Sequence, residues 1–317
     1  MRAARMKSAA PHHPCYTPRR VPVCREMRLR DWRIQVREWA GKADAPTLFL
    51  LHGWADTSAT FQFLADQLPD DWHLIAPDLR GFGGSQRAGA TYWFAEYLAD
   101  LESLLNAMLP ENEPALLLGH SLGGNIAMFY AGVRPARVRA VISLDAFGLP
   151  DMPPELAPRR MAAWLDQMAA PVGFRVYPDF DALAARLRLE NPHTPEERIR
   201  YLAQALGARG EDGQVHLAMD PAHRYFSPAL YRAGEAHAYW RQVCAPTLWI
   251  VQEDAQWRRT MLKLDDAQYR AATECFRDFE EVRLPACGHN MHHSRPEAVA
   301  QAVVRFLART GAAGNTP

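Results

Sequence analysis

The sequence predicts an α/β fold: a doubly wound, mostly parallel sheet with an inserted helical lid. Short apolar runs of strand type alternate with helical patterns from about residue 29 to residue 141, and the alternation resumes after residue 246. Between them, residues 147–243 have helical patterns separated by proline-rich turns. Alternating strands and helices are typical of a parallel sheet covered by helices on both faces. We therefore expect residues 27–146 and 244–310 to form one core and residues 147–243 to form the lid.

The strands and helices in the first half of the core follow from their apolar patterns. Residues 32–36 alternate as a half-buried strand does, and residues 47–51, TLFLL, are the continuous apolar run of a strand covered on both faces. A third strand is expected at 73–76. Helices are expected at 57–68 and 92–109, where apolar residues recur at helical spacing.

The segment 114–124, PALLLGHSLGG, joins an apolar strand to a helical pattern through Gly-His-Ser-Leu-Gly. Glycines on both sides of Ser121 allow a turn too sharp for other residues. Such a strand–turn–helix raises the serine hydroxyl to where a base and a substrate can both reach it. A serine that only caps the following helix is the simpler alternative. The strand before the motif and the helix after it favour a nucleophile.

The remaining elements complete the sheet around the lid. A strand is expected at 138–144, directly before the lid, and further strands are expected at 247–251 and 281–284, with a last helix at 296–307. The helical patterns within the lid cover residues 155–169, 179–190, 195–208 and 228–242. An insertion at this point lies beyond the carboxyl ends of the strands, where open α/β sheets bind ligands.

Composition excludes several classes of function. The 317 residues include 36 basic and 36 acidic side chains, which argues against a nucleic-acid-binding protein and against a polybasic membrane-surface protein. No apolar run approaches the roughly 18 residues of a membrane span. The five cysteines are scattered and form no C-x-x-C pair, so we expect free thiols and a cytoplasmic protein.

The N-terminal segment 1–26 differs from the rest of the chain. Six basic residues and one acidic residue give it a net charge of +5, and four prolines interrupt it. No apolar stretch follows the charges, which argues against a secretory signal. We expect a disordered basic extension here, with Met27 as an alternative start of translation, and a short tail at 311–317.

Five segments match one protein family in that family's own order. They are LHGW, PDLRGFGGS, GHSLGG, APTLWIVQED and CGHNMHHSRPEAV, which begin at residues 51, 77, 119, 245 and 287. On these segments the chain resembles the α/β-hydrolase fold family, in particular its lid-bearing serine hydrolases and esterases. The resemblance implies that Ser121 is the nucleophile and His289 the base. It also implies that the backbone N–H groups of Trp54 and Leu122 form the oxyanion hole.

The acid that orients the histidine has two candidates. Many members of the family carry it in a G-x-x-D segment after the strand that is TLWIV here, but Gln252 replaces the glycine and Ala255 the acid. Asp254 lies one residue early. The other position in the family is the end of the strand after the nucleophile helix, where Asp145 leaves a buried apolar run and needs a partner. We favour Asp145, because open α/β sheets place their sites at strand ends, and keep Asp254 as the alternative.

Other polar groups have simpler interpretations. His292 and His293 follow His289 closely, but no carboxylate motif accompanies them, so we expect no metal and no organic cofactor. His120 is expected to be a packed core residue. The glycine-rich segment 80–85, RGFGGS, lacks the Lys-Ser/Thr ending of a P-loop and is expected to shape the rim of the pocket.

These observations predict a carboxylesterase-like serine hydrolase that acts on a small, apolar, ester-like molecule through an acyl-enzyme. The serine argues against the dehalogenase and epoxide-hydrolase branches of the family, which use a carboxylate nucleophile. A C–C bond hydrolase or a lactonase on the same triad is one alternative. A ligand-binding protein on a hydrolase scaffold is another, because Ala255 stands where an acid is common. No nucleic-acid partner is expected, and the sequence sets no oligomeric state.

Overall fold

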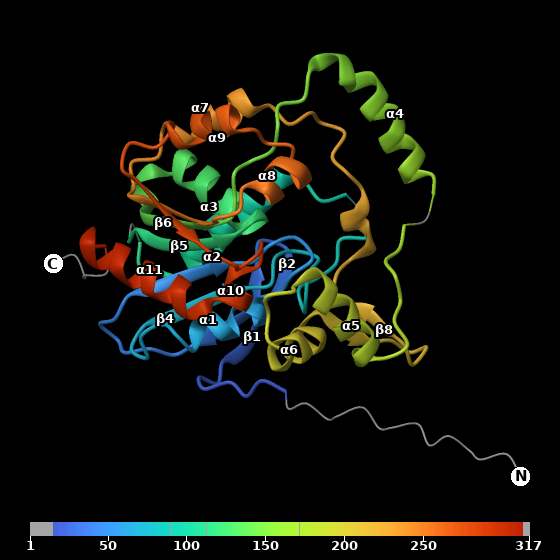
Figure 1. Ribbon diagram of the computed structural model, residues 1–317, viewed down its shortest axis with the longest axis horizontal. Coiled ribbons are helices and arrows are strands. Elements are labelled where there is room, and N and C mark those ends of the chain that lie inside the picture. The colour runs from blue at the N-terminus through green and yellow to red at the C-terminus, as the bar shows by residue number, and fades with distance from the viewer. Residues whose placement is uncertain (1–14, 90, 112, 171, 313–317) are drawn as a thin grey trace, which may run out of the picture.

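A computed structural model describes residues 15–89, 91–111, 113–170 and 172–312, with an eight-stranded sheet at its centre (Figure 1). The strands lie in the order β1-β2-β4-β3-β5-β6-β9-β10. The pairs β1–β2 and β2–β4 are antiparallel, and the other neighbours are parallel. The strands are β1 (Val23–Leu29), β2 (Trp32–Trp39), β3 (Thr47–Leu51), β4 (His73–Pro77), β5 (Ala115–His120), β6 (Val138–Leu144), β9 (Thr247–Gln252) and β10 (Phe279–Leu284). The predicted mostly parallel, doubly wound sheet is confirmed.

The two faces of the sheet bury separate apolar clusters. In β3, Phe49 and Leu51 belong to one cluster and Leu48 and Leu50 to the other, because successive side chains of a strand point to opposite faces. The first face is covered by α2 (Phe94–Met108), α3 (Leu122–Val133), α7 (Ala233–Trp240) and α9 (Asp266–Thr273). The second face is covered by α1 (Gln62–Ala65), α10 (Met291–Ser294) and α11 (Pro296–Arg309). Burial on both faces explains the continuous apolar run of β3.

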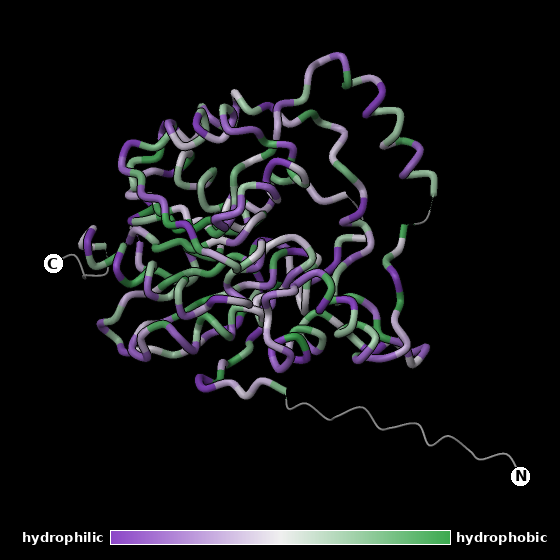
Figure 2. The backbone as a smooth tube through the Cα atoms, in the orientation of Figure 1, coloured by the Kyte–Doolittle hydropathy of each residue, from purple (hydrophilic) through white to green (hydrophobic). Residues whose placement is uncertain are grey.

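Hydropathy along the backbone follows this layering. Hydrophobic residues gather on the central strands and the helix faces against them, whereas the outer loops are mostly hydrophilic (Figure 2). Among the described residues, no helix combines the length and the hydropathy that a membrane-spanning segment requires. All five cysteines are free, as predicted.

The predicted helix at 57–68 is shorter and less regular in the structure. A 3₁₀ turn, η1 (Ser58–Phe61), leads directly into the single turn of α1. Every residue of these two turns is buried. The segment therefore has no solvent-exposed face, and packing on all sides sets its shape more than helical periodicity does. Elements that the apolar pattern did not predict include the hairpin of β7 (Gly207–Arg209) and β8 (Val215–Leu217), the turn η2 (Pro135–Arg137), α8 (Gln256–Met261) and α9.

The parts of the segment inserted between β6 and β9 differ in how they pack against the core. The helices α5 (Phe180–Glu190) and α6 (Glu196–Leu206) share an apolar cluster with Phe63 of the core. The turn η4 (Pro221–Arg224) docks on the glycine-rich segment, where the rings of Phe82 and His223 stack with centroids 3.8 Å apart. After η3 (Pro154–Leu156), α4 (Ala157–Met168) has no buried residue and lies apart from the sheet, at the upper right of Figure 1.

The helix α7, which the prediction assigned to the lid, packs in the core instead. Its last residue, Trp240, is fully buried, with its ring stacked on Phe276 at 5.7 Å and edge-on to Trp249 at 6.3 Å. Figure 1 shows α7 beside α9 over the same face of the sheet. Helical spacing reveals the apolar face of a helix but not the surface that it covers. For this reason the sequence alone grouped every helix between β6 and β9 into one unit.

Residues 15–26, expected to belong to a disordered extension, are attached to the core. The Tyr16 hydroxyl donates a hydrogen bond to the Asp66 carboxylate at 2.7 Å, and the Arg20 backbone N–H donates to the other oxygen of that carboxylate at 2.7 Å. The Arg20 guanidinium donates to the backbone carbonyl of Trp72 at 2.8 Å. The Asp66 carboxylate therefore holds this segment through a hydroxyl and a backbone N–H, and a backbone carbonyl holds the Arg20 side chain, none of which the count of charges revealed.

The strand β1 also lies in the segment that was expected to be disordered. It begins at Val23, and its residues before and after Met27 pair with residues of β2. The rest of the expected extension, residues 1–14, and residues 313–317 of the expected tail lie outside the described residues.

Candidate active site

Ser121 stands in a strained turn between β5 and α3. Its φ is 50° and its ψ is −111°, a region that residues with a side chain rarely adopt. A Cβ atom on Gly119 would overlap the backbone of Gly123, and one on Gly123 would overlap the carbonyl group of Leu51. The Ser121 N–H donates to the Leu144 carbonyl at 2.9 Å. The turn predicted from the glycines is therefore present, and the neighbouring strand holds it.

Asp145 leaves the sheet beside Ser121, at the same edge. The parallel register pairs His120 with Leu144 and Leu144 with Ile250, so β5, β6 and β9 end side by side. Asp145 also has a positive φ of 50°, and its N–H donates to the Ile250 carbonyl at 2.9 Å. This backbone turn places a carboxylate at the carboxyl ends of the strands, where α/β sheets place their sites.

The Asp145 carboxylate is buried and accepts hydrogen bonds from two residues. His289 Nδ1 lies 2.7 Å from Oδ2. The Gln252 side-chain amide donates to Oδ2 at 2.8 Å, and its backbone N–H donates to Oδ1 at 3.3 Å. A buried charge needs such donors to offset its lost hydration. Because an ionised carboxylate only accepts, His289 carries its proton on Nδ1, which leaves Nε2 free to act as a base.

Asp254, the alternative acid, does not reach the histidine. It is exposed, and its side chain accepts the backbone N–H of Gln256 at 2.8 Å, at the start of α8. Of the two candidates, the structure brings Asp145 to His289. Sequence reasoning missed the role of Gln252, although the replacement of the usual glycine at that position was the signal.

His120, the residue before Ser121, holds His289 at the edge of the sheet where Ser121 lies. The rings of His120 and His289 lie 4.7 Å apart, and His120 Nε2 donates to the His289 carbonyl at 3.1 Å. On its other side His289 stacks on Trp257 of α8, with centroids 4.2 Å apart and planes 18° apart. Burial, together with the neighbouring His292 and His289, lowers the pKa of His120 well below its usual value, so His120 is neutral. These contacts fix the plane of the His289 ring.

The segment after β3 approaches the serine closely. A Cβ on Gly53 would lie 3.4 Å from Ser121 Cβ and 2.7 Å from His120 Nδ1, so only glycine fits there. The neighbouring His52 is fully buried, and its Nε2 accepts the Leu79 N–H at 2.8 Å. Its Nδ1 must then carry the proton, and it donates to the Gly53 carbonyl at 2.8 Å.

The hydrogen bond from His52 to the Gly53 carbonyl also orients the N–H group of Trp54. The peptide between Gly53 and Trp54 is trans, so its N–H points opposite to the carbonyl that His52 holds. The second N–H group considered for the oxyanion hole belongs to Leu122, the first residue of α3, where helix N–H groups have no partner within the helix. The Trp54 side chain is exposed and touches Phe174 of the inserted segment, with ring centroids 6.2 Å apart.

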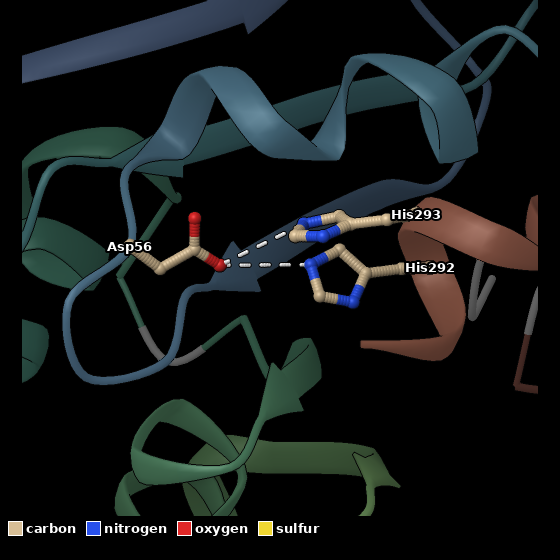
Figure 3. Close-up of side chains that lie close together, drawn as sticks. All are labelled: Asp56, His292 and His293. Carbon is tan, nitrogen blue, oxygen red and sulfur yellow. Dashed lines mark ion pairs between the residues drawn. The ribbon is translucent and has the colours of Figure 1, made fainter. Parts of the chain in front are cut away.

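His292 and His293 meet a carboxylate that the sequence gave no reason to expect. Asp56, from the loop after β3, lies 3.6 Å from His292 and 4.0 Å from His293, and all three side chains are buried (Figure 3). Burial lowers the pKa of both histidines. Burial raises the pKa of Asp56, but the two histidines outweigh this effect and lower the pKa to about 2. The expectation of no metal rested on the lack of an accompanying carboxylate, and that argument does not hold.

The glycine-rich segment is built into the fold. Arg80 is buried and donates to both oxygens of Asp100, at 2.6 and 2.9 Å. The Gly83 N–H donates to the Ala218 carbonyl of the inserted segment at 2.7 Å. The segment therefore anchors the insertion to the core, and its expected place at the rim of the pocket stays a prediction.

Comparisons with known proteins agree with this architecture. The sequence model of the α/β-hydrolase fold matches residues 46–186. The chain is 27% identical over 306 residues to a serine hydrolase-like protein of Danio rerio, covering 93% of this chain and 91% of that protein. It is 28% identical over 288 residues to a 2-(acetamidomethylene)succinate hydrolase of Mesorhizobium japonicum, covering 90% and 95%.

A solved structure gives the same result for the fold. The thioesterase domain from the curacin biosynthetic pathway superimposes with a TM-score of 0.76 at 22% identity, covering 90% of this chain and 99% of that domain. At this identity the likeness concerns the fold alone. Together with the matched sequence model and the order of the strands, it shows that the chain has the α/β-hydrolase fold.

Proposed function

We propose that this protein is a serine hydrolase that cleaves an ester-like carbonyl compound through an acyl-enzyme. The observation that carries the proposal is the 2.7 Å bond between His289 and the buried carboxylate of Asp145, beside the strained turn of Ser121. A serine hydroxyl is a weak nucleophile unless a positioned base takes its proton. In this proposal Ser121 is the nucleophile, His289 the base and Asp145 the acid.

The reaction follows from these roles. Ser121 Oγ attacks the carbonyl carbon while His289 Nε2 takes the hydroxyl proton, and Asp145 stabilises the imidazolium that forms. The tetrahedral intermediate collapses, and His289 gives the proton to the leaving alcohol. Water then attacks the acyl-enzyme by the same route, with His289 again as base, and this step releases the acid and regenerates Ser121.

The developing oxyanion is assigned to the N–H groups of Trp54 and Leu122. The orientation that His52 imposes on the Gly53 carbonyl supports the first of these donors, and the open N-terminus of α3 supports the second. Each donor aimed at such an oxyanion contributes about 3 kcal/mol to the lowering of the barrier.

The substrate is proposed to be a small, apolar, ester-like molecule, as for a carboxylesterase. The contact between Trp54 and Phe174 supports this, because it brings an aromatic ring of the inserted segment to the residue beside the serine turn. We assign the role of a lid to the inserted segment up to α7. The five free cysteines support a reducing, cytoplasmic location.

A second candidate keeps the triad and changes the substrate. The relative named 2-(acetamidomethylene)succinate hydrolase aligns with nine-tenths of the chain, so the alternative of a C–C bond hydrolase or lactonase is retained. The alternative of a pure ligand-binding protein rested on Ala255. It loses its support, because Asp145 meets His289 without an acid at position 255.

The test compares Ser121→Ala with the full-length wild type on short p-nitrophenyl esters and on 2-(acetamidomethylene)succinate. We expect Ser121→Ala to lose on the order of 10⁴-fold or more in kcat. A fluorophosphonate probe should label the wild type and not the variant. Ser103→Ala, which removes a hydroxyl on α2 bonded only to the Ala99 carbonyl, is the matched control and should keep both properties. Labelling or turnover that survives in Ser121→Ala would refute the proposal.

A further inference from the structure

Asp56, His292 and His293 form a buried cluster from two distant parts of the chain. Asp56 lies in the loop after β3, whereas the two histidines are consecutive residues of α10. The exposed fraction is 6% for Asp56, 0% for His292 and 3% for His293. Figure 3 shows both rings directed at the same carboxylate oxygen.

The polar atoms of this cluster lack hydrogen-bond partners. Among the described residues, both ring nitrogens of His292, both of His293 and Oδ2 of Asp56 are buried without a partner. The separations of 3.6 and 4.0 Å exceed the 2.7–3.2 Å of an N–H···O bond. Buried polar groups are almost always satisfied, and leaving several unsatisfied in one place is costly. A ligand that accepts several lone pairs at once would satisfy Asp56 Oδ2 and one nitrogen of each ring.

We propose that Asp56, His292 and His293 bind a divalent transition-metal ion of the zinc class. The three ligand atoms all lie within 4.8 Å of one another. Zinc binds imidazole nitrogen and carboxylate oxygen at about 2.0–2.2 Å, which puts neighbouring ligand atoms of a tetrahedral site about 3.4 Å apart. The Asp56 oxygen is already within about 0.6 Å of that spacing from each ring. Small rotations of the side chains therefore complete the site.

The surroundings of Asp56 suit a ligand. Its other oxygen, Oδ1, accepts the Thr57 N–H at 2.8 Å, which holds the carboxylate in place as partners behind a metal ligand do. A small pocket beside the cluster is lined by Asp56 together with Leu206 and Leu217 of the inserted segment.

A bound ion would join the two segments that frame the proposed active site. The loop 52–57 carries both Asp56 and Gly53, which lies against Ser121, and α10 begins two residues after His289. The ring of His292 also lies 4.5 Å from that of His120. The ion would therefore stiffen the connection between these segments, whatever reaction the protein performs.

The test uses the full-length chain, freed of metal by a chelator that is then removed. Calorimetry with Zn²⁺ should give one bound equivalent, and Co²⁺ should produce a visible absorption band. Asp56→Asn and His293→Gln should each weaken Zn²⁺ binding by on the order of 100-fold or more. Thermal unfolding of the wild type should shift upwards with Zn²⁺, and the shift should disappear in both variants.

Two controls separate this cluster from other histidines. His216→Gln removes an exposed histidine that pairs with Asp212 at 2.9 Å, and a His12→Gln/His13→Gln variant removes the other adjacent histidine pair of the sequence. Both should leave Zn²⁺ affinity unchanged. If the cluster variants do not fold, X-ray absorption of the Zn²⁺-loaded wild type decides, because two imidazole ligands and one oxygen are expected. Absence of tight binding in the wild type, a shell without two imidazoles, or loss of binding in the control variants would overturn the proposal.

Discussion

The choice of Asp145 as the acid of the triad leads to a prediction with a large expected effect. In Asp145→Asn, the amide oxygen can take the Oδ1 position and accept the Gln252 backbone N–H, which puts the amide NH₂ at the Oδ2 position, against His289 Nδ1. Nδ1 of His289 must then accept, so its proton moves to Nε2. The ring in this tautomer cannot take the proton of Ser121.

The magnitude follows from this change of tautomer. Loss of the orienting carboxylate in a triad costs on the order of 10⁴-fold in kcat, or about 5.4 kcal/mol at 1.36 kcal/mol per factor of ten. Asp254→Asn is the matched control, because Asp254 only accepts the Gln256 N–H in an exposed loop, and asparagine keeps that acceptor. We expect it to change kcat by less than about twofold.

Both variants are to be measured by steady-state hydrolysis of a p-nitrophenyl ester, with thermal unfolding as a check that each is folded. A folded Asp145→Asn with kcat within about tenfold of the wild type would contradict the argument. A severe loss in Asp254→Asn would contradict it as well and would return the role of the acid to the loop after β9.

Three further substitutions test separate parts of the structure. Gln252→Leu removes the side-chain donor to Asp145 but keeps the backbone donor. Steady-state assays should therefore show kcat reduced by about 10- to 100-fold. The control Glu253→Gln should have little effect on kcat. His52→Phe frees the Gly53 carbonyl, and kcat/KM should fall by on the order of 10²-fold, with KM nearly unchanged. Trp240→Ala should lower the free energy of unfolding by about 3–5 kcal/mol in denaturant titrations, whereas Leu165→Ala on exposed α4 should change it by less than about 0.5 kcal/mol.

The parts of the fold that the sequence predicted well are those in which local pattern and burial agree. The strands at 47–51 and 138–144 are found at those residues, because strands covered on both faces leave an apolar run that needs no partner to be recognised. The turn at Ser121 was predicted because its tight backbone leaves no room for a side chain at the glycines on either side. Such features depend on a few consecutive residues.

The features that the sequence did not reveal depend on contacts between distant residues. The apolar face of α7 is the same whether it covers α3 and the sheet or another lid helix, so its place in the core could not be read from its spacing. Residues 15–26 resembled a free tail, because the Asp66 carboxylate that accepts the Tyr16 hydroxyl and the Arg20 backbone N–H lies on a different element. The meeting of Asp56 with His292 and His293 likewise depends on the packing of α10 against η1 and α1.

Gln252 shows how one departure from a family pattern explains another. In the sequence, the glycine missing at position 252 and the acid missing at position 255 both weakened the match to the G-x-x-D segment of the family. In the structure, the carboxylate of Asp145 lies at the end of the neighbouring strand, and it is buried, so it needs donors besides His289. A glycine at position 252 could offer only its backbone N–H, whereas glutamine adds the 2.8 Å bond from its side chain. With Asp145 as the proposed acid, glutamine is favourable at the end of β9 and no acid is needed at position 255.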